Sequence, residues 1–460
     1  MRCALATFSL AAADTAFVHL FEWGWSDVAN ECEKVLGPKG YDAVQVSPPM
    51  EHITGDQWWT RYQPVSYKLT SRSGDESAFE DMVKRCNSAG VRVVVDAVIN
   101  HMASGGGTGI AGSTFGDRAF PAAGYTQDNF HHNGGDKDSN CAVTDYSNKD
   151  NVQLCDLSGL TDLCTGCDDT KNKLIAYLKN LKSKGSNVGF RIDAAKHQDA
   201  GELGAVLSGA GSTWNFQEVI SGSGEAVSPE MYLNNGHVSE FNFARQLAPN
   251  FKDENKLCYL DSFGPSWGFI DTSKAVTFMD NHDTQRGEAI LTYKDGDVYY
   301  LANVFMLATQ YGYPKVMSSY AFDSHDQGPP SYPVNCGNDW ICEHRRPEVA
   351  NMVAWRKTAG DNAMKNFVKD GCNHIGFSRG SAFVALNRDG SGSWQTTVQT
   401  GMPAGTYCDV AQSDDPSSCP KVTVDSSGQA SITVPGLKAV AFHAGVKAAS
   451  EAQAVADIVV

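Results

Sequence analysis

Short runs of apolar, β-branched and aromatic residues recur along the first part of the chain, and stretches with the period of an amphipathic helix separate them. The clearest helical stretches cover 76–89, 169–184 and 298–310. Repetition of strand and helix favours a parallel sheet, and eight repeats predict a closed (β/α)8 TIM barrel, an α/β fold with its helices outside. The eight candidate strands are 16–20, 41–46, 91–96, 188–193, 214–218, 238–243, 275–280 and 315–318.

One interval between predicted strands is too long for a simple helical return. Residues 101–165, after the third strand, are rich in Gly, Asn, Asp and Ser and show little periodicity. We therefore expect a loop-rich inserted domain there, with the barrel formed by residues 1–100 and 166–360. The GTGIAG sequence at 107–112 formally matches a dinucleotide fingerprint, but no helical pattern follows it, so we interpret it as a flexible loop.

After residue 360 the pattern changes, because strands follow one another without helices between them. This predicts a C-terminal antiparallel β-sandwich domain over 361–445. The alanine-rich segment 446–460 is expected to form a tail outside that sheet. The strands predicted for the domain include 381–386, 396–399, 421–424 and 430–434.

The composition and the N-terminal residues indicate the kind of binding partner and the compartment. The 460 residues carry a formal net charge of -16 that is spread along the chain, which argues against nucleic acid or a membrane surface as partner. Thirteen cysteines favour disulfides and an oxidising compartment. Residues 1–13, MRCALATFSLAAA, resemble a short secretory signal peptide, so we expect a secreted, extracellular protein.

Three acidic residues lie at or just after the ends of predicted strands, where a barrel gathers its connecting loops. Asp193 lies in GFRIDAAKH, Glu218 ends WNFQE and Asp283 ends FMDNHD. Each alone is usually a turn former or a helix cap, but their recurrence on different strands indicates an active site. In an extended strand Arg191 points to the same side as Asp193, which suits Asp193 to the ionised state. The apolar neighbours of Glu218 favour a protonated carboxyl.

These motifs and DAVINH resemble the α-amylase family of glycoside hydrolases, specifically its animal-type, chloride-binding branch. The resemblance extends over almost the whole chain, since QVSPPMEH, WWTRYQPVSYKL, VMSSYAF and CGNDWICEHR share it. It implies endo-hydrolysis of α-1,4-glucosidic bonds in starch, glycogen and related polysaccharides with retention of anomeric configuration. It also implies that Asp193 is the nucleophile, Glu218 the general acid and base, and Asp283 the acid that steadies the distorted sugar. Retaining chemistry needs such a pair of carboxyl groups.

The same resemblance implies seven further contacts with an α-glucan substrate. Three aromatic residues would form a stacking platform, two histidines would hydrogen-bond sugar hydroxyls in the cleaved subsite, and a lysine and a histidine would line the leaving-group side. In that order they are Trp58, Trp59 and Tyr62, then His101 and His282, then Lys196 and His197. Outside this context such histidines and tryptophans usually belong to the core.

A calcium ion is also implied by the resemblance. It would be bound by Asn100, Asp162 and the backbone oxygens of Gln153 and His197, and oxygen ligands from both parts would join the inserted domain to the barrel. From the residues alone, Asp162 would be read as a turn cap.

A chloride ion is implied at Arg191, Asn281 and Lys315. The branch pattern has a second arginine where this chain has Lys315, and a lysine is a point charge without the planar fork of a guanidinium. We therefore hypothesise chloride activation of moderate strength. The segment after Asp283, TQRGEAILTYKDGD, also departs from the branch because it lacks a glycine-rich mobile loop.

The resemblance implies four disulfides and leaves four cysteines without a counterpart. Cys164 and Cys167 form a CTGC sequence, for which zinc or redox chemistry would need a second ligand pair, so a local disulfide or two free thiols is expected. Cys258 and Cys372 remain unassigned. The implied pairs are Cys32 with Cys86, Cys141 with Cys155, Cys336 with Cys342, and Cys408 with Cys419.

Three other functions fit parts of this pattern. A transglycosylase would pass the same glycosyl intermediate to another sugar instead of water. An inactive barrel kept for binding would not need three intact acids, and a metal-dependent hydrolase would want imidazoles converging on one ion. The acids favour a hydrolase, which we expect to be a monomer.

Overall fold

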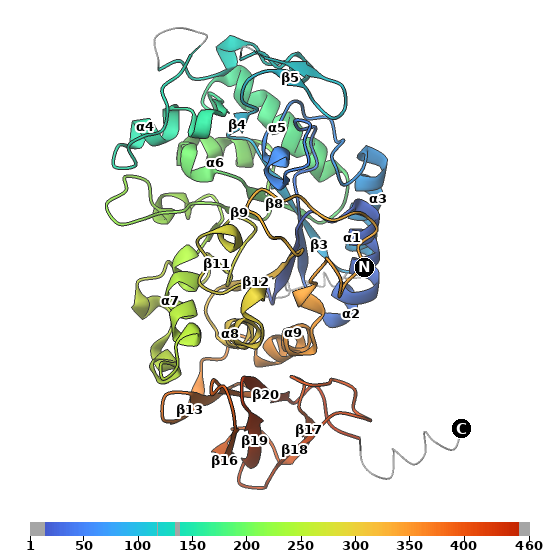
Figure 1. Ribbon diagram of the computed structural model, residues 1–460, viewed down its shortest axis with the longest axis vertical. Helices are drawn as coiled ribbons and strands as arrows, with labels where there is room; N and C mark the ends of the chain where they lie inside the picture. Colours follow the sequence, from blue (N-terminus) through green and yellow to red (C-terminus); the bar gives the residue numbers. More distant parts are fainter. Residues whose placement is uncertain (1–13, 117, 134–138, 450–460) are drawn as a thin grey trace, which may run out of the picture.

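A closed barrel of eight parallel strands forms the centre of the structure, a computed structural model that describes residues 14–116, 118–133 and 139–449 (Figure 1). The strand order is β1, β12, β11, β10, β9, β8, β3, β2, which confirms the predicted (β/α)8 barrel. The predicted signal peptide at 1–13 and residues 450–460 of the predicted tail lie outside the described residues. The strands are β1 (Phe17–Leu20), β2 (Ala43–Val46), β3 (Arg92–Ala97), β8 (Val188–Ile192), β9 (Asn215–Gln217), β10 (His237–Ser239), β11 (Ala275–Thr277) and β12 (Tyr313–Ser318).

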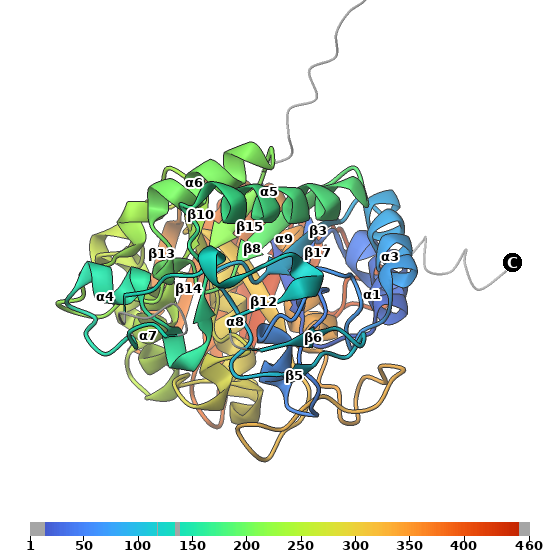
Figure 2. The ribbon, with the colours of Figure 1, turned by 90° about the horizontal axis from the view of Figure 1, so that it is seen from above.

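Helices surround the strands, as the view from above shows (Figure 2). Capping fixes several of their starts: the side chain of Asp75 accepts a hydrogen bond from Ala78 N at 2.9 Å before α3, and that of Asp199 accepts one from Gly201 N at 2.9 Å before α6. None of the helices in the described ranges is long and apolar enough to cross a bilayer. The helices around the barrel are α1 (Trp25–Glu31), α2 (Gly37–Lys39), α3 (Glu76–Ser88), α5 (Asp168–Ser183), α6 (Ala200–Gly209), α7 (Phe241–Lys252), α8 (Asp297–Ala308) and α9 (Pro347–Ala359).

The prediction of the sixth strand, 238–243, is wrong beyond Ser239. The chain turns into α7 there because the carboxylate of Glu240 accepts a hydrogen bond from Asn242 N at 3.0 Å and caps the helix. Phe241 and Phe243 continue the apolar pattern of the strand, but they lie on the buried face of α7 and pack into the core.

The segment between β3 and β8 lies over the end of the barrel where the strands finish (Figure 1). Before α5 it is loop-rich, as predicted, and its described residues hold the short helix α4 (Lys149–Leu154) and three 3-10 helices, Pro121–Ala123, Gln127–Asn129 and Leu157–Gly159. The GTGIAG sequence begins a hairpin and is followed by a strand, not by a helix. Two antiparallel ladders complete the segment, namely β4 (His101–Met102) with β7 (Thr161–Asp162) and β5 (Gly107–Thr108) with β6 (Thr114–Phe115).

The C-terminal strands form the predicted antiparallel domain at the opposite end of the barrel (Figure 1). A four-stranded sheet and two pairs of strands enclose a separate core that includes Phe383, Trp394 and Phe442. The sheet is β13 (Lys365–Asp370), β14 (His374–Arg379), β15 (Ala382–Asn387) and β20 (Lys438–His443); the pairs are β16 (Ser393–Gln399) with β19 (Gln429–Pro435) and β17 (Gly405–Cys408) with β18 (Lys421–Val424).

The expectation of a tail outside the sheet is wrong for its first residues. Val446 O accepts a hydrogen bond from Cys408 N at 3.3 Å, and Ala448 N donates one to Thr406 O at 3.1 Å. The free backbone edge of β17 explains this, because an unpaired strand edge offers N–H and C=O groups to any extended segment nearby.

Six disulfides link the described residues. The four pairs implied by the resemblance are confirmed, and two more are present: Cys164 with Cys167, and Cys258 with Cys372. Cys258 lies in the 3-10 helix Leu257–Ser262 beside the barrel, whereas Cys372 follows β13. This bond therefore ties the barrel covalently to the C-terminal domain.

Loop length predicts how much this tie contributes to stability. Cys258 and Cys372 are 114 residues apart, and serine at both positions is expected to lower the free energy of unfolding by about 4 to 5 kcal/mol, because the unfolded chain gains loop freedom. The matched control removes Cys336–Cys342, a separation of 6, and is expected to cost about 2 kcal/mol. Urea unfolding measures both, and equal losses would contradict the explanation by loop entropy.

Candidate active site

One buried arginine binds three carboxylates where the barrel strands end. Arg191 lies on β8, in register with Asp96 on the neighbouring β3. Its Nη1 is 2.7 Å from Asp96 Oδ1 and 2.7 Å from Asp193 Oδ1, and its Nη2 is 2.6 Å from Glu218 Oε1. The fork of a guanidinium fixes the direction of each bond, so two of the predicted catalytic acids are held side by side.

The local backbone sets where these acids point. Asp193 follows directly after β8, and Glu218 follows directly after β9. Ala194 has φ 47°, a left-handed conformation that is uncommon for a residue with a side chain. This turn directs Ala194 N to Glu218 Oε2 at 2.9 Å, so the strained residue orients one acid beside the other.

Burial controls the protonation of the cluster. It raises the pKa of Asp193 above its ordinary value, and the nearby carboxylates of Glu218 and Asp96 oppose the stabilising charge of Arg191. Burial and the charge of Glu218 likewise raise the pKa of Asp283 to about 7. The expectation that Arg191 favours the ionised state of Asp193 is therefore outweighed, because burial and two nearby carboxylates act against one cation that also binds Asp96 and Glu218.

An aromatic wall adjoins the acids. The ring of His282 stacks on Tyr62 with centroids 5.0 Å apart, and Trp58 meets His282 edge-on at 5.7 Å. His282 Nε2 is 3.3 Å from Asp283 Oδ2, while Tyr62 donates its hydroxyl to Asp96 Oδ2 at 2.9 Å. Trp59, next to Trp58, is partly exposed. The predicted platform therefore stands against the carboxylate cluster.

Both ring nitrogens of His101 make contacts within the protein. Its Nε2 lies 2.9 Å from the carbonyl oxygen of Tyr62, and its Nδ1 lies 3.2 Å from Asn100 Nδ2. The residue is buried at the start of β4, and burial lowers its pKa to about 4. In this arrangement the imidazole is neutral and supports the loop that carries Tyr62.

A cavity of about 320 Å³ opens on the other side of Glu218 and Asp283. The predicted Lys196 and His197 line it, as expected for the leaving-group side. Sequence reasoning missed five further lining residues, namely Tyr146, Leu157, Ala194, Ile220 and Glu225. Lys196 Nζ lies 2.5 Å from Glu225 Oε2 and 4.5 Å from the Tyr146 ring centroid. Tyr146 comes from the inserted segment, where the sequence shows only an aromatic residue among polar ones.

The segment after Asp283 is held by a charged contact. Glu288 Oε1 pairs with Arg245 Nη2 at 2.6 Å, and Arg245 Nη1 donates to Ser221 O at 2.9 Å. Ser221 lies in the loop that follows Glu218. Arg245 thus links the loops that carry two of the acids.

The comparisons with known proteins agree with this geometry. Residues 365–445 match the family model for the C-terminal all-beta domain of alpha amylase. The alpha-amylase of Streptomyces violaceus is 47% identical over 432 residues, which cover 92% of this chain and 73% of that protein. The chain belongs to the α-amylase family. It is therefore a glycoside hydrolase.

Relatives from animals match nearly the whole chain as well. The pancreatic alpha-amylase of Rattus norvegicus is 41% identical over 474 residues, covering 91% of this chain and 92% of that protein. The crystal structure of alpha-amylase I from Eisenia fetida superposes with a TM-score of 0.87 at 36% identity, covering 93% of this chain and 97% of that one. A variant of that Eisenia enzyme was solved with maltohexaose.

The residues expected to bind calcium form two pairs of neighbours. The β4–β7 ladder pairs His101 with Asp162, and so places Asn100 near Asp162. His197 Nδ1 is 2.9 Å from Val152 O, which brings Gln153 close to His197. Asn100 Oδ1 is buried without a hydrogen-bond partner among the described residues, and Asp162 is fully buried. This set of oxygens fits a hard cation.

In contrast, no three His, Cys, Asp or Glu side chains converge as metal ligands anywhere in the part of the chain that the structure describes. The carboxylate of Asp162 is instead hydrogen-bonded by His131 Nδ1 at 2.5 Å, and burial raises its pKa to about 7.

The residues expected to bind chloride include two buried cations, Arg191 and Lys315. Lys315 on β12 is buried, and among the described residues its Nζ donates one hydrogen bond, to Gln45 Oε1 at 3.4 Å. Burial, with the charge of Arg191 adding to it, lowers the pKa of Lys315 to about 7. Asn281 Oδ1 accepts hydrogen bonds from Asp283 N and Thr284 N, so its amide nitrogen is left as the donor. Lys315 is therefore a buried cation without an ion-pair partner among the described residues, whereas Arg191 is already bound by three carboxylates.

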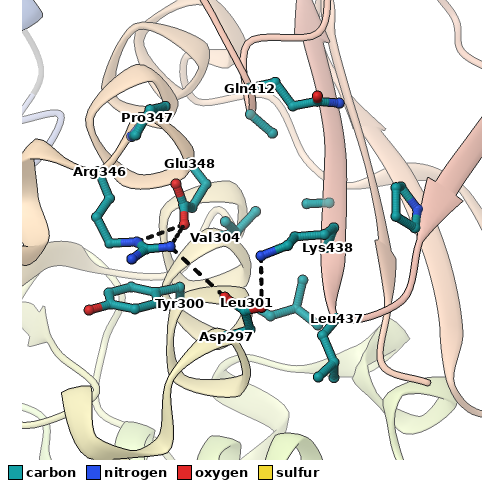
Figure 3. A pocket seen from close by; sticks show the side chains of 13 residues that line it. Asp297, Tyr300, Leu301, Val304, Arg346, Pro347, Glu348, Gln412, Leu437 and Lys438 are labelled. Carbon is teal, nitrogen blue, oxygen red and sulfur yellow. Dashed lines mark hydrogen bonds and ion pairs between the residues drawn. The ribbon is translucent and has the colours of Figure 1, made fainter. Parts of the chain in front are cut away.

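A second cavity, of about 490 Å³, lies at the junction of α8, α9 and β20 (Figure 3). Its charged side chains pair with one another: Arg346 Nη2 is 2.6 Å from Glu348 Oε1, and Lys438 Nζ is 2.8 Å from Asp297 Oδ2. The guanidinium of Arg346 covers the ring of Tyr300 at 3.8 Å. None of the predicted site residues lines this cavity, which lies between the barrel and the C-terminal domain.

Proposed function

We propose that the chain is an endo-acting α-amylase that hydrolyses internal α-1,4-glucosidic bonds of starch and glycogen with retention at the anomeric carbon. One observation carries the assignment of the reaction to residues: a single guanidinium holds the carboxylates of Asp193 and Glu218 at 2.7 and 2.6 Å, so that both face one space. Closely spaced carboxyl groups are the arrangement that retention requires. The maltohexaose bound by the Eisenia relative supports an α-glucan as substrate.

The proposed reaction has two displacements. In the first, an Asp193 oxygen attacks the anomeric carbon while the protonated Glu218 gives its proton to the glycosidic oxygen, and the carbon–oxygen bond to the leaving sugar breaks. In the second, the ionised Glu218 takes a proton from water, the water oxygen bonds to the anomeric carbon, and Asp193 leaves as a carboxylate. The two inversions give net retention.

The other polar residues hold the sugar. Asp283 would accept hydrogen bonds from hydroxyls of the ring that distorts, with His282 beside it at 3.3 Å. Trp58, Trp59 and Tyr62 would contact the apolar faces of glucose units. Lys196, His197 and the aromatic Tyr146 would bind the departing part of the chain, since they line the cavity behind Glu218.

A reducing-sugar assay on soluble starch tests this function. Reducing ends should appear quickly while the iodine-staining polymer is cut to short chains, because endo attack halves long molecules early. Proton NMR of the first products should show the α anomer before mutarotation. Initial products in the β form, or no hydrolysis of soluble starch, would refute the proposal.

We further propose that calcium binds Asn100, Asp162 and the backbone oxygens of Gln153 and His197. Bound there, the ion would supply positive charge to neutralise buried Asp162 and would hold α4 and the β4–β7 ladder against the barrel. Asn100 and Asp162 offer the side-chain oxygens, and His131 would release the carboxylate to the cation.

Chelation is therefore expected to destabilise the protein. Removing calcium should lower the melting temperature by several degrees, because a ligand bound only to the folded state stabilises it by mass action. Asp162→Asn should remove most of that calcium-dependent shift, whereas Asp156→Asn, a carboxylate of the same segment that pairs with Arg118 at 2.9 Å, should retain it. A melting temperature that chelator leaves unchanged in the parent chain would contradict the site.

We also propose that chloride binds between Arg191, Asn281 and Lys315. The anion would compensate Lys315, which has no ion-pair partner within the described residues, and would share Arg191 with the carboxylates of Asp96, Asp193 and Glu218.

Chloride affinity is expected to fall as pH rises through about 7, the pKa of Lys315 without the anion, because the lysine is charged below that pH and neutral above it. Lys315→Arg stays charged and should show little pH dependence from 6 to 9. Titration of activity with chloride at fixed ionic strength measures this. A half-activating concentration that is constant with pH in the parent chain would exclude the role of Lys315.

Secretion is proposed on the six disulfides, which form in oxidising compartments. We propose that the enzyme acts as a monomer, since the catalytic acids and the cavity behind them come from one chain.

A further inference from the structure

Arg286 is buried behind the catalytic acids and is enclosed by aromatic rings. It ends the 3-10 helix Thr284–Arg286 that begins directly after Asp283, and it is 8% exposed. Its guanidinium carbon lies 4.4 to 5.2 Å from the ring centroids of four residues, which we call the aromatic cage: Phe21, Trp58, Tyr320 and Phe322.

The aromatic cage joins parts of the chain that are far apart in sequence. Phe21 follows β1, Trp58 belongs to the predicted substrate platform, and Tyr320 and Phe322 follow β12. The rings also contact one another: Phe21 stacks on Tyr320 at 5.7 Å and meets Trp58 at 6.0 Å. Arg286 therefore lies where these aromatic residues from distant parts of the chain come together.

The guanidinium is directed back to the catalytic turn. Nη1 donates a hydrogen bond to the carbonyl oxygen of His282 at 2.6 Å, and the backbone N of Arg286 donates to Asp283 O at 3.1 Å. Within the described residues no carboxylate forms an ion pair with Arg286. A buried cation that has ring faces as its main surroundings is bound through the negative potential of those faces.

We propose that Arg286 is a positioning residue that fixes the turn carrying His282 and Asp283 against the wall containing Trp58. Its backbone-directed hydrogen bond holds the turn, its stacking holds the wall, and its positive charge lies close to Asp283. A change at Arg286 therefore moves the acid and the platform together, although Arg286 touches no substrate. This inference rests on the proposed roles of Asp283 and Trp58.

The charge should be visible in the pH dependence of kcat/KM. Asp283 needs to be ionised to accept hydrogen bonds from sugar hydroxyls, and loss of a nearby positive charge favours its protonated form. The charged and titratable groups around Asp283 include Arg191, Arg286, Glu218, Asp96, His282, Tyr62 and, across the cavity, Lys196, His197 and Glu225. Only Arg286 changes in the test.

The experiment compares Arg286→Met and Arg286→Lys with the parent chain on a maltooligosaccharide. Arg286→Met should lower kcat/KM about 10- to 100-fold, as expected when a catalytic group moves by about 1 Å, and should shift the acidic limb of the profile upward by about half a pH unit or more. Arg286→Lys should restore the position of the acidic limb, because it keeps the charge, but should recover only part of kcat/KM, because it lacks the planar fork.

Arg346→Met is the matched control, since Arg346 also covers an aromatic ring, at 3.8 Å, but in the cavity beside the C-terminal domain. It should leave the pH profile unchanged. If Arg286→Met does not fold, the fully folded Arg286→Lys still tests the positioning role through its reduced kcat/KM. Variants that lose melting temperature yet keep the parent kcat/KM and acidic limb would overturn the proposal. An inactive parent chain would instead refute the proposed function.

Discussion

Asp193→Asn is expected to abolish hydrolysis of soluble starch, with kcat at least about 10⁴-fold below that of the parent chain. The amide cannot form the glycosyl ester, and it also removes one of the three negative charges on Arg191. The loss should appear in kcat, because the aromatic platform that binds the glucan remains in place. Steady-state assays with purified protein measure it, together with substrate binding by calorimetry.

The control for this change is Asp409→Asn. Asp409 is a similarly buried carboxylate, 2% exposed, in the C-terminal domain, where it accepts a hydrogen bond from Ala441 N at 2.9 Å. It should lose stability while keeping the parent kcat. Undiminished starch hydrolysis by Asp193→Asn would exclude the covalent mechanism with this nucleophile.

Glu218→Gln is expected to lower kcat on starch by about 10²- to 10⁴-fold, since the glutamine can neither protonate the leaving oxygen nor deprotonate water. The defect should depend on the leaving group. Fluoride leaves without a proton, so α-maltosyl fluoride should still form the glycosyl-enzyme rapidly, followed by slow release. Rapid-quench kinetics should show this as an initial burst.

A strong anionic nucleophile separates the two roles of Glu218. Azide needs no general base, so it should restore turnover of α-maltosyl fluoride by Glu218→Gln and give the α-azide. With Asp193→Asn, azide should not give the retained α-azide product. If the fluoride and starch reactions of Glu218→Gln were slowed by the same factor, Glu218 would not be the proton donor.

The barrel follows from the sequence because each of its strands is a short apolar run between polar turns. Eight such runs with helical stretches between them allow few other folds. The errors occur where one pattern serves two structures: Phe241 and Phe243 are apolar in both a strand and a buried helix, and only the cap by Glu240 decides. The spacing of apolar residues along the sequence does not reveal such a local hydrogen bond.

The site could be predicted only as separate parts. The acids stand out as polar residues at strand ends, and the resemblance gives them roles. Their common partner does not follow from spacing, because Arg191 reaches Asp96 and Glu218 only once β3, β8 and β9 are neighbours. The same holds for Tyr146, which an irregular loop brings to Lys196, and for the bond between Cys258 and Cys372. These contacts depend on long-range closure of the chain.

The most direct test of the mechanism is identification of the covalent glycosyl-enzyme by mass spectrometry. A 5-fluoro glycosyl fluoride forms the intermediate through a good leaving group and slows its hydrolysis, because the ring fluorine disfavours positive charge in the second transition state. After digestion, we predict one added glycosyl mass on the peptide containing Asp193, and none on peptides containing Glu218 or Asp283. A label on another residue, or complete turnover with β-anomeric product and no label, would contradict the assignment.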